Sequence, residues 1–550
     1  MNSNKIIVLL SGEISSGKST VCDGLKSQFN FHHVSTKEIL GRVAERKYKG
    51  VDNIPTDRDF FQKFGRQLDE DTKGSWVLKE LLSDLKNYDR VLVDSVRIQE
   101  QIDAFRTTYG QAVVHIHVYS THDWRKKHFI ERRRAIDAFL TIKQAEEKFN
   151  QYSSDPTEKQ VITLKDKADL VIYTEDSSSA RDQVVKAASY LRLLPPVNKR
   201  NVDVVIGGQF GSEGKGQIVA HISPEYHCLV RVGGPNAGHK VYNEPNPDVF
   251  HIIPSGSVKA PHAKIVIGPG AVISEETILR EIQQFGIEPS RIIIDEQATI
   301  IHDKDIALEN KLDKIGSTKQ GVGAATAKNI LERLKSSDKH KARHSKKLKN
   351  YVGKAHEVFE EMHSKNKKIL LEGTQGTLLS LHHGYYPYVT SRDTTVGGCL
   401  AECGFGPLKV RKIIMVARRY PIRVKSPDGG TSGEFYSNEL SLKEISKRSG
   451  YPLNALKKIE KTSTTNKQRR IAEFSWDLFR RACEINTPTD IALTFSDYIT
   501  FENQKARRYD QLSDDTTKFI DELERCAGVP VSLISTRFAH RAVIDRRNWI

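Results

Sequence analysis

Two segments of this chain join an apolar run to a glycine-rich loop, and this combination constrains the fold more than any other feature. They read KIIVLLSGEISSGKST from residue 5 and VDVVIGGQFGSEGKG from residue 202. Each is typical of a buried strand, a phosphate-binding loop and a helix, which together open an α/β domain. The Pro pair in residues 191–201 (LRLLPPVNKRN) indicates a linker. We therefore predict two α/β domains, residues 1–195 and 201–550, the second with a central, mainly parallel sheet.

Composition limits the classes of protein to consider. The apolar runs are far shorter than the roughly 20 residues of a membrane-spanning helix, and the first residues lead into a glycine-rich turn rather than a signal peptide. We therefore expect a cytoplasmic protein without a membrane partner. The six cysteines are too few for a disulfide framework, and we interpret Cys399 and Cys403 as buried structural thiols rather than zinc ligands.

The unusual feature of the composition is the formal net charge of +16. It fits nucleic acid as a ligand, and it equally fits an enzyme whose substrates are all anions. Much of the excess lies in residues 333–349 (RLKSSDKHKARHSKKLK), which we interpret as a solvated helix or loop. Because no aromatic residue is interleaved there, we do not expect a stacking surface for single-stranded nucleic acid.

The first loop, GEISSGKST, fits the pattern G-x-x-x-x-G-K-[ST] in full. In such a loop the backbone N–H groups cradle phosphates, the lysine pairs with the β- and γ-phosphates, and the hydroxyl, here of Ser19, holds Mg²⁺. A second buried strand, within residues 88–97, ends at Asp94, which is placed to order the magnesium shell. The candidate ATP-binding residues of this domain are Gly12, Gly17, Lys18, Ser19, Thr20 and Asp94.

Residues 1–195 resemble nucleoside monophosphate kinases, nearest to the phage deoxynucleotide kinases and dephospho-coenzyme A kinase. The segment FFQKFGRQLDED resembles the acceptor-side helix of those kinases, which makes Arg66 a candidate for the acceptor phosphate. Arg97 follows the second strand. Arg132 lies in KKHFIERRRAIDAF (residues 126–139), which is either a phosphate-clamping lid or a solvated basic helix face. A degenerate, purely structural kinase domain is the alternative.

The second loop, GGQFGSEGKG, departs from the standard pattern twice. Gly208 stands one residue too far from Gly214, and Gly216 occupies the place of the magnesium-binding hydroxyl. The blocks that follow occur in the order found in adenylosuccinate synthetases, a family that residues 201–550 resemble throughout. These blocks are GGPNAGHKVY, HIIPSG, IGPGAVIS, IGSTKQGVGAA, LEGTQGTLLSLHHGYYPYVTSRDTT, TSTTNKQRR and ISTRFAHR.

This resemblance implies a reaction and the residues that perform it. A nucleoside triphosphate phosphorylates the oxygen on carbon 6 of a purine nucleotide, and the amino group of L-aspartate then displaces the phosphate, with Mg²⁺ as cofactor. The catalytic residues would be Ser212, Lys215 and His239, and Ser212 and the Gly238 carbonyl would be metal ligands. The phosphate-binding set would be Gly211, Ser212, Glu213, Gly214, Lys215, Gly216, Gln217, Gly238, Arg469 and Asp497.

The same resemblance implies sites for the two other substrates. The purine monophosphate would be bound by Asn236, Ala237, Thr318, Arg333, Gln375, Thr390 and Lys467. The aspartate carboxylates would be bound by Thr464, Thr465, Arg469 and Arg470. The family sends an arginine from the neighbouring subunit to the 5′-phosphate, and Arg333 lies within one residue of that spacing, so we expect a homodimer.

The chain departs from the ordinary family pattern in ways that point to a different purine. Ser212 stands where the family has the aspartate that removes the proton from ring nitrogen 1, and a hydroxyl is no base unaided. The smaller, uncharged side chain leaves room for a 2-amino group. Lys467 replaces an arginine that reaches the ribose 2′-hydroxyl. Phe495, in TFSD, replaces a lysine beside the donor base, and STRFAHR replaces a turn beside that base.

These departures resemble the phage-type branch of the family, the 2-aminodeoxyadenylosuccinate synthetases, which take dGMP, L-aspartate and ATP. A fused deoxynucleotide kinase would suit that route, and a phage-encoded protein would work in the host cytoplasm. The nearest rival interpretation is an ordinary adenylosuccinate synthetase that takes IMP and GTP. A non-catalytic purine nucleotide sensor is the second rival, and a nucleic-acid binder, suggested only by the charge, is the third.

Overall fold

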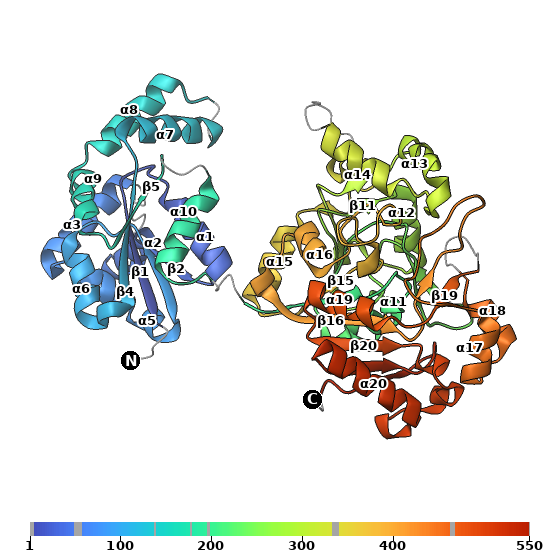
Figure 1. Ribbon diagram of the computed structural model, residues 1–550. Helices are drawn as coiled ribbons and strands as arrows, with labels where there is room; N and C mark the ends of the chain where they lie inside the picture. The colour runs from blue at the N-terminus through green and yellow to red at the C-terminus, as the bar shows by residue number, and fades with distance from the viewer. Residues whose placement is uncertain are drawn as a thin grey trace. The chain divides into compact units, whose positions relative to one another are not determined.

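The computed structural model describes residues 5–48, 58–136, 139–175, 179–194, 199–332, 340–461 and 468–548. The chain divides into two compact units, Met1–Pro195 and Pro196–Ile550, which we call the N-terminal unit and the larger unit (Figure 1). Both are α/β units with mainly parallel sheets, which confirms the predicted fold class. No helix in the described ranges is long and apolar enough to cross a membrane.

The N-terminal unit is built on a five-stranded parallel sheet in the order β2-β3-β1-β4-β5. The apolar run near the start forms the central strand, because alternate side chains of that strand can be buried on both faces. Ile7 and Leu9 join one hydrophobic cluster, and Val8 and Leu10 join another. The strands are β1 (Ile6–Ser11), β2 (His32–Ser35), β3 (Arg90–Asp94), β4 (Val113–Tyr119) and β5 (Leu170–Tyr173).

Helices cover both faces of this sheet. Side chains of α1 and α10 pack on the Val8 face, and those of α2 to α6 pack on the Ile7 face (Figure 1). Helices α7 and α8 pack against each other beyond the sheet. The helices are α1 (Lys18–Phe29), α2 (Thr36–Lys47), α3 (Arg58–Thr72), α4 (Trp76–Glu80), α5 (Leu82–Asn87), α6 (Gln99–Tyr109), α7 (His122–Ile136), α8 (Ile142–Ser153), α9 (Pro156–Val161) and α10 (Ala180–Tyr190).

The larger unit is built on a ten-stranded sheet in the order β14-β12-β10-β7-β15-β6-β16-β20-β21-β22. Its strands are parallel except for β22, which pairs antiparallel with β21. The apolar run from residue 202 forms β6 in the middle, where both faces are buried. The strands are β6 (Val202–Gly207), β7 (Cys228–Arg231), β10 (Lys264–Ile267), β12 (Ile292–Asp295), β14 (Val352–Gly353), β15 (Ile369–Glu372), β16 (Val410–Arg418), β20 (Asp490–Thr494), β21 (Val531–Ser535) and β22 (Val543–Asp545).

Helix α11 packs on one face of this sheet, and α15, α16, α19 and α20 pack on the other. The helices are α11 (Lys215–Ile222), α12 (Glu275–Gln284), α13 (Asp303–Glu309), α14 (Val322–Leu331), α15 (Ala355–Ser364), α16 (Val396–Cys403), α17 (Leu442–Ser449), α18 (Leu453–Ile459), α19 (Trp476–Asn486) and α20 (Asp514–Ala527). Three small sheets complete the unit: β8 (His239–Val241) with β9 (Asp248–Phe250), β11 (Val272–Ile273) with β13 (Thr299–Ile300), and β17 (Ile422–Arg423), β19 (Arg470–Ala472) and β18 (Glu439–Leu440).

In its described part, residues 340–349, the basic segment 333–349 exposes most of its charged side chains, as expected, while two of its apolar residues are buried. The backbone N–H of Ala342 donates to the Ala298 carbonyl at 2.9 Å, and Ala342 and Leu348 are buried in a hydrophobic cluster. The segment is therefore anchored here, because two of its few apolar residues find a core.

Candidate active site

The larger unit contains a cavity of about 1070 Å³ lined by several of the predicted site residues. Its walls come from the loop after β6, the segment around β8, residues 315–323 and residues 388–391. The predicted residues that line it are Gly211, Ser212, Gly214, Lys215, Gly216, Gln217, Asn236, Ala237, Gly238, His239, Thr318, Gln375, Thr390 and Arg469. The fold thus gathers residues that lie up to 258 positions apart in the chain (Gly211 to Arg469).

The loop after β6 owes its shape to three residues whose backbone lies in the left-handed region. Gly211, Ser212 and Gly214 have φ of 88°, 53° and 90°. Glycine adopts this region without strain, so Gly211 and Gly214 suit the loop, and Gly214 caps α11, which begins at Lys215. Ser212 is the exposed residue between them and lines the cavity.

Glu213 supports this loop from inside rather than facing the cavity. Its fully buried carboxylate accepts the backbone N–H groups of Gln209 at 3.1 Å and Gly211 at 2.8 Å. The same carboxylate pairs with the Lys215 ammonium at 2.6 Å, and that ammonium also donates to the Gln375 carbonyl. The structure therefore assigns the Glu213 side chain to bracing the loop and holding Lys215, although the sequence placed it with the phosphate-binding residues.

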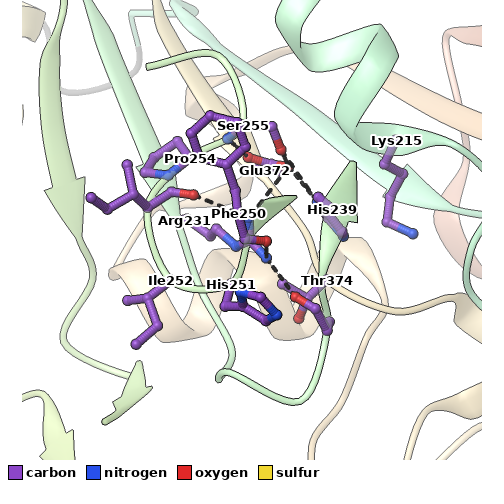
Figure 2. Close-up of polar contacts among 12 residues, drawn as sticks. Lys215, Arg231, His239, Phe250, His251, Ile252, Pro254, Ser255, Glu372 and Thr374 are labelled. Carbon is purple, nitrogen blue, oxygen red and sulfur yellow. Dashed lines mark hydrogen bonds and ion pairs between the residues drawn. The ribbon is translucent and has the colours of Figure 1, made fainter. Parts of the chain in front are cut away.

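His239 lies on β8 and is oriented by a buried carboxylate at the end of β15. Its Nδ1–H donates to the Glu372 carboxylate at 2.5 Å, and Glu372 also accepts the Ser255 backbone N–H at 2.7 Å and the Ser255 hydroxyl (Figure 2). This contact leaves Nε2 as the ring nitrogen available to a ligand. Sequence reasoning missed Glu372 and Ser255, which stand far from His239 in the chain.

Burial and neighbouring charges set the pKa values of this pair. Burial, with the positive charge of Arg231, lowers the pKa of His239 to about 4. Burial alone would raise the pKa of Glu372, but Arg231 and His239 lower it to about 2. At neutral pH the pair is therefore a neutral imidazole hydrogen-bonded to a carboxylate.

Arg231 also fixes the segment that leads to His239. Its guanidinium donates to the carbonyls of Ala237 at 2.9 Å, Ile253 at 3.1 Å and Phe250 at 3.3 Å. The preceding residue, Asn236, carries a buried Oδ1 that has no hydrogen-bond partner among the described residues. An orphaned buried acceptor at a cavity wall indicates a place for a donor of a ligand.

Gln375 offers a second such acceptor. Its Nε2 donates to the Thr390 hydroxyl at 2.7 Å, while its Oε1 is buried without a partner in the described part of the chain. Both residues line the cavity together with Thr318 and Asn236. With Ala237, the structure thus brings five predicted purine-binding residues to one cavity, two of them with unused acceptors.

A buried cluster holds Arg469 and the loop of Ser212 together. The Glu460 carboxylate pairs with Arg418 at 2.6 Å and with Arg469 at 3.2 Å, and Arg418 donates to the Ser212 carbonyl at 3.3 Å. The Arg418 guanidinium also stacks 3.9 Å from the Phe495 ring centre. Sequence reasoning missed Arg418 and Glu460, because no local pattern marks a buried ion pair.

Other predicted residues lie elsewhere. Asp497 does not line the cavity; it is buried, accepts from Gln504 at 2.9 Å, and burial raises its pKa to about 7. The Arg470 guanidinium, also outside the lining, donates to the Ser432 hydroxyl at 2.9 Å and the Gly433 carbonyl at 2.8 Å. Four predicted residues lie outside the described residues: Arg333, Thr464, Thr465 and Lys467.

Arg423 is a cavity residue that the sequence did not single out. Its guanidinium lies 4.0 Å from the Phe210 ring centre and donates to the Ser432 carbonyl at 2.8 Å, while Nη2 is buried with no partner in the described ranges. Burial, with the nearby Arg470, lowers its pKa to about 10, so it is a cation at neutral pH. A buried cation at the wall suits an anionic substrate.

The N-terminal unit has a second glycine-rich loop, between β1 and α1. Gly12 and Gly17 have φ of 147° and 99°, and the Lys18 ammonium donates to the carbonyls of Gly12 at 2.6 Å and Glu13 at 2.9 Å. Burial lowers the pKa of Lys18. Ser19 and Thr20 follow on α1, and Asp94 ends the neighbouring strand β3, as predicted.

An arginine of α7 that the sequence did not single out contacts this loop. Arg125 is buried and pairs with Glu13 of the loop at 2.8 Å, whereas Arg132 is exposed. Arg97 pairs with the buried Glu158 at 2.9 Å, and Glu158 also accepts the Ile14 backbone N–H at 2.9 Å. Arg66 is half-buried on α3.

Sequence and structure comparisons identify similar proteins for the larger unit. The sequence model of one family, described as "Adenylosuccinate synthetase", matches residues 204–335 and 332–503. The adenylosuccinate synthetase of Methanocaldococcus jannaschii is 35% identical over 355 residues, which are 63% of this chain and 96% of that protein.

Two solved structures have a similar fold. One is the fully ligated adenylosuccinate synthetase of Plasmodium falciparum, with a TM-score of 0.54 and 22% identity, over 63% of this chain and 100% of that one. The other is the succinoaminodeoxyadenylate synthetase (PurZ) of cyanophage S-2L, bound to dGMP and dATP. Its TM-score is 0.53 and its identity 24%, over 63% of this chain and 95% of that one.

Proposed function

The chain belongs to the adenylosuccinate synthetase family, and on this premise we propose that its larger unit joins L-aspartate to carbon 6 of dGMP, with ATP as phosphate donor. The product would be 2-amino-N6-succinyl-deoxyadenylate, a precursor of diaminopurine deoxynucleotides. The observation that carries this choice of purine is Ser212 at the wall of the cavity. The cyanophage enzyme of similar fold, bound to dGMP and dATP, agrees with it.

The described residues that line the cavity offer no spare carboxylate to serve as base. Among the described residues that line it, only Glu244 and Glu309 carry carboxyl groups. Glu309 accepts the backbone N–H groups of Gly321 at 2.8 Å and Gly323 at 2.6 Å, and Glu244 accepts the Tyr242 hydroxyl. We therefore propose that the proton on purine nitrogen 1 leaves through the Ser212 hydroxyl to a phosphate oxygen.

His239 would stabilise the oxygen on carbon 6 while it accepts the phosphoryl group. Burial lowers the pKa of His239 to about 4 and so keeps its imidazole neutral. The negative charge of the transferring phosphate beside Nε2 would raise that pKa, and Glu372 on Nδ1 would hold the resulting imidazolium in place. Lys215 would neutralise charge on the same phosphate.

The donor set suits Mg²⁺ as the cofactor of this step. The Ser212 hydroxyl and the Gly238 carbonyl are oxygen donors at the cavity wall, and Mg²⁺ takes oxygen ligands, mostly from phosphates and water. When bound there, the ion would lower the charge of the transferring phosphate.

Two features support ATP rather than GTP as the donor. Asp497, which ends the TFSD segment beside the expected place of the donor base, already accepts from Gln504, and burial raises its pKa to about 7. A carboxyl group that is half protonated near neutral pH is a poor acceptor for the N–H groups of guanine. Phe495, in place of a lysine, is covered by Arg418.

Aspartate would be bound by Arg469, Thr464 and Thr465, with Arg470 in support. Arg469 lines the cavity and is held by Glu460. We also propose a homodimer, in which Arg333 of each subunit reaches the 5′-phosphate in the other.

We propose a deoxynucleotide kinase activity for the N-terminal unit, which would phosphorylate the diaminopurine monophosphate. The β1–loop–α1 geometry around Lys18 and the placement of Asp94 support it. The test compares the whole chain with Lys18→Ala: nucleotide phosphorylation should be lost while formation of the succinyl product is unchanged. Phosphorylation that persists in Lys18→Ala would reject the kinase assignment.

The choice of purine and donor is decided by one assay. The protein is incubated with aspartate and Mg²⁺, with IMP and dGMP each crossed against ATP and GTP, and the succinylated product is followed by mass. We expect product from dGMP with ATP. Product only from IMP with GTP would instead establish the second candidate, an ordinary adenylosuccinate synthetase, which the archaeal relative at 35% identity favours.

A further inference from the structure

Three side chains of the types that bind transition metals meet in the N-terminal unit. Cys22 comes from α1, His33 from β2 and Asp94 from the end of β3. One ligand atom of each, the thiol sulfur, a ring nitrogen and a carboxylate oxygen, lies within 4.8 Å of the others. The three residues are 11 to 72 positions apart in the chain, so only the fold brings them together.

The register of the sheet explains this meeting. Strands β2 and β3 are parallel, and His33 pairs with Leu92 while Ser35 pairs with Asp94. Because side chains two residues apart share a face, His33, Leu92 and Asp94 point to the same side of the sheet. Leu92 packs in one cluster with Cys22 of α1, which shows that α1 covers this side.

The polar atoms of this group have few partners. The Nε2 atom of His33 is buried, and no described residue forms a hydrogen bond with it. Cys22 is only 3% exposed. The Asp94 carboxylate accepts from the Ser95 hydroxyl at 3.0 Å, and the nearby Lys18 ammonium donates to the Gly12 and Glu13 carbonyls instead. A buried ring nitrogen without a partner destabilises the unit unless a ligand engages it.

We propose that Cys22, His33 and Asp94 form a binding site for a divalent transition metal ion of the zinc class. Sulfur, imidazole nitrogen and carboxylate oxygen are the donors that Zn²⁺ takes in proteins. Three protein ligands leave a fourth position for water in a tetrahedral site. Mg²⁺ does not suit this set, because it takes oxygen ligands and binds thiol and imidazole poorly.

The site is distinct from the Mg²⁺ expected with a nucleotide at Ser19, although both would use Asp94. The two ions would have different ligands, because only the zinc-class ion would be bound by Cys22 and His33. The inference therefore does not depend on kinase activity, and it is tested by metal binding alone.

The test titrates the full chain with Co²⁺, which reports a thiolate ligand by a sulfur-to-cobalt charge-transfer band in the near ultraviolet. We expect the band to saturate at one equivalent and to disappear when Zn²⁺ is added. Excess Mg²⁺ should leave it unchanged. Cys22→Ser should abolish the band, and His33→Gln should weaken Co²⁺ binding at least about ten-fold.

Cys526→Ser is the matched control, because Cys526 is a partly buried thiol of the larger unit. It should keep the band. Circular dichroism of each variant establishes that it folds, and His33→Gln, which leaves the buried thiol in place, serves if Cys22→Ser does not fold. A wild-type chain without the band would overturn the proposal, and so would a band that survives in Cys22→Ser or is unaffected in His33→Gln.

Discussion

At the scale of single residues, the proposed choice of purine rests on Ser212 at the wall of the cavity. Ser212 lines the cavity on a left-handed turn, and its carbonyl is held by Arg418 at 3.3 Å. The backbone is therefore fixed, and the side chain alone varies the chemistry at this point. A carboxylate here would add a base and a charge, while a hydroxyl adds neither.

We predict that Ser212→Asp shifts nucleotide preference from dGMP toward IMP. The carboxylate would accept the proton of nitrogen 1 and occupy the room needed by a 2-amino group. The ratio of kcat/KM for dGMP to that for IMP should fall at least about ten-fold, equivalent to about 1.4 kcal/mol of differential transition-state binding. Ser212→Asn, whose side chain has the shape of aspartate but is not a base, should lose activity with dGMP and gain none with IMP. An unchanged ratio in Ser212→Asp contradicts the assignment.

A second residue-scale feature is the contact between Glu372 and His239 at 2.5 Å. We predict that Glu372→Gln lowers kcat by about 10 to 100-fold with little change in KM, because an amide cannot stabilise the imidazolium formed during phosphoryl transfer. Steady-state kinetics with dGMP and ATP measure both constants. Ser255→Ala, which removes the hydroxyl contact but keeps the carboxylate, should cost much less. Equal losses in the two variants would argue against the special role of the carboxylate.

At the scale of elements, two histidines of β4 are buried in the core of the N-terminal unit. The Ser11 hydroxyl lies 2.7 Å from His115 Nε2 and 2.8 Å from His117 Nδ1, and all three residues are fully buried. Burial lowers the pKa of His115 to about 4 and that of His117 to about 3. Both imidazoles are therefore neutral in the folded unit at pH values where they would be charged in the unfolded chain.

This predicts that the N-terminal unit loses stability as the pH falls from about 6.5 toward 4. In that range the unfolded chain binds more protons than the folded one, so the free energy of unfolding rises with pH and falls with acid. Hydrogen exchange of residues 113–119, corrected for the intrinsic effect of pH, measures it. His117→Gln should show a weaker dependence on pH. A pH-independent protection of β4 in the wild type would contradict the prediction.

At the scale of the whole molecule, the larger unit is expected to work as a dimer that shares residues. If Arg333 acts in the neighbouring subunit, Arg333→Ala and His239→Asn should each be inactive alone. In a mixed dimer the subunit with intact His239 receives the intact Arg333 of the other, so one site of the two is complete. An equal mixture, refolded or co-expressed, should recover about a quarter of wild-type activity. No recovery would place Arg333 within its own site or outside any site.

What the sequence determined by itself is local. The two largely apolar runs form β1 and β6, because successive apolar residues can be buried on both faces of a parallel sheet. The glycine spacing placed the loops that end at Lys18 and Lys215, because left-handed backbone favours glycine. Family blocks of sequence pointed to His239 and Gln375, which the structure brings to one cavity.

Only the tertiary structure decided which distant side chains meet. The Glu372 contact with His239 spans 133 positions, and the pairing of Glu460 with Arg418 spans 42. The sequence also does not show that the Glu213 side chain points into the loop. Nor does it show that Cys22, His33 and Asp94 lie close together. These contacts depend on strand order, register and the packing of helices and loops, which bring together residues from separate elements and leave no periodic trace in the chain.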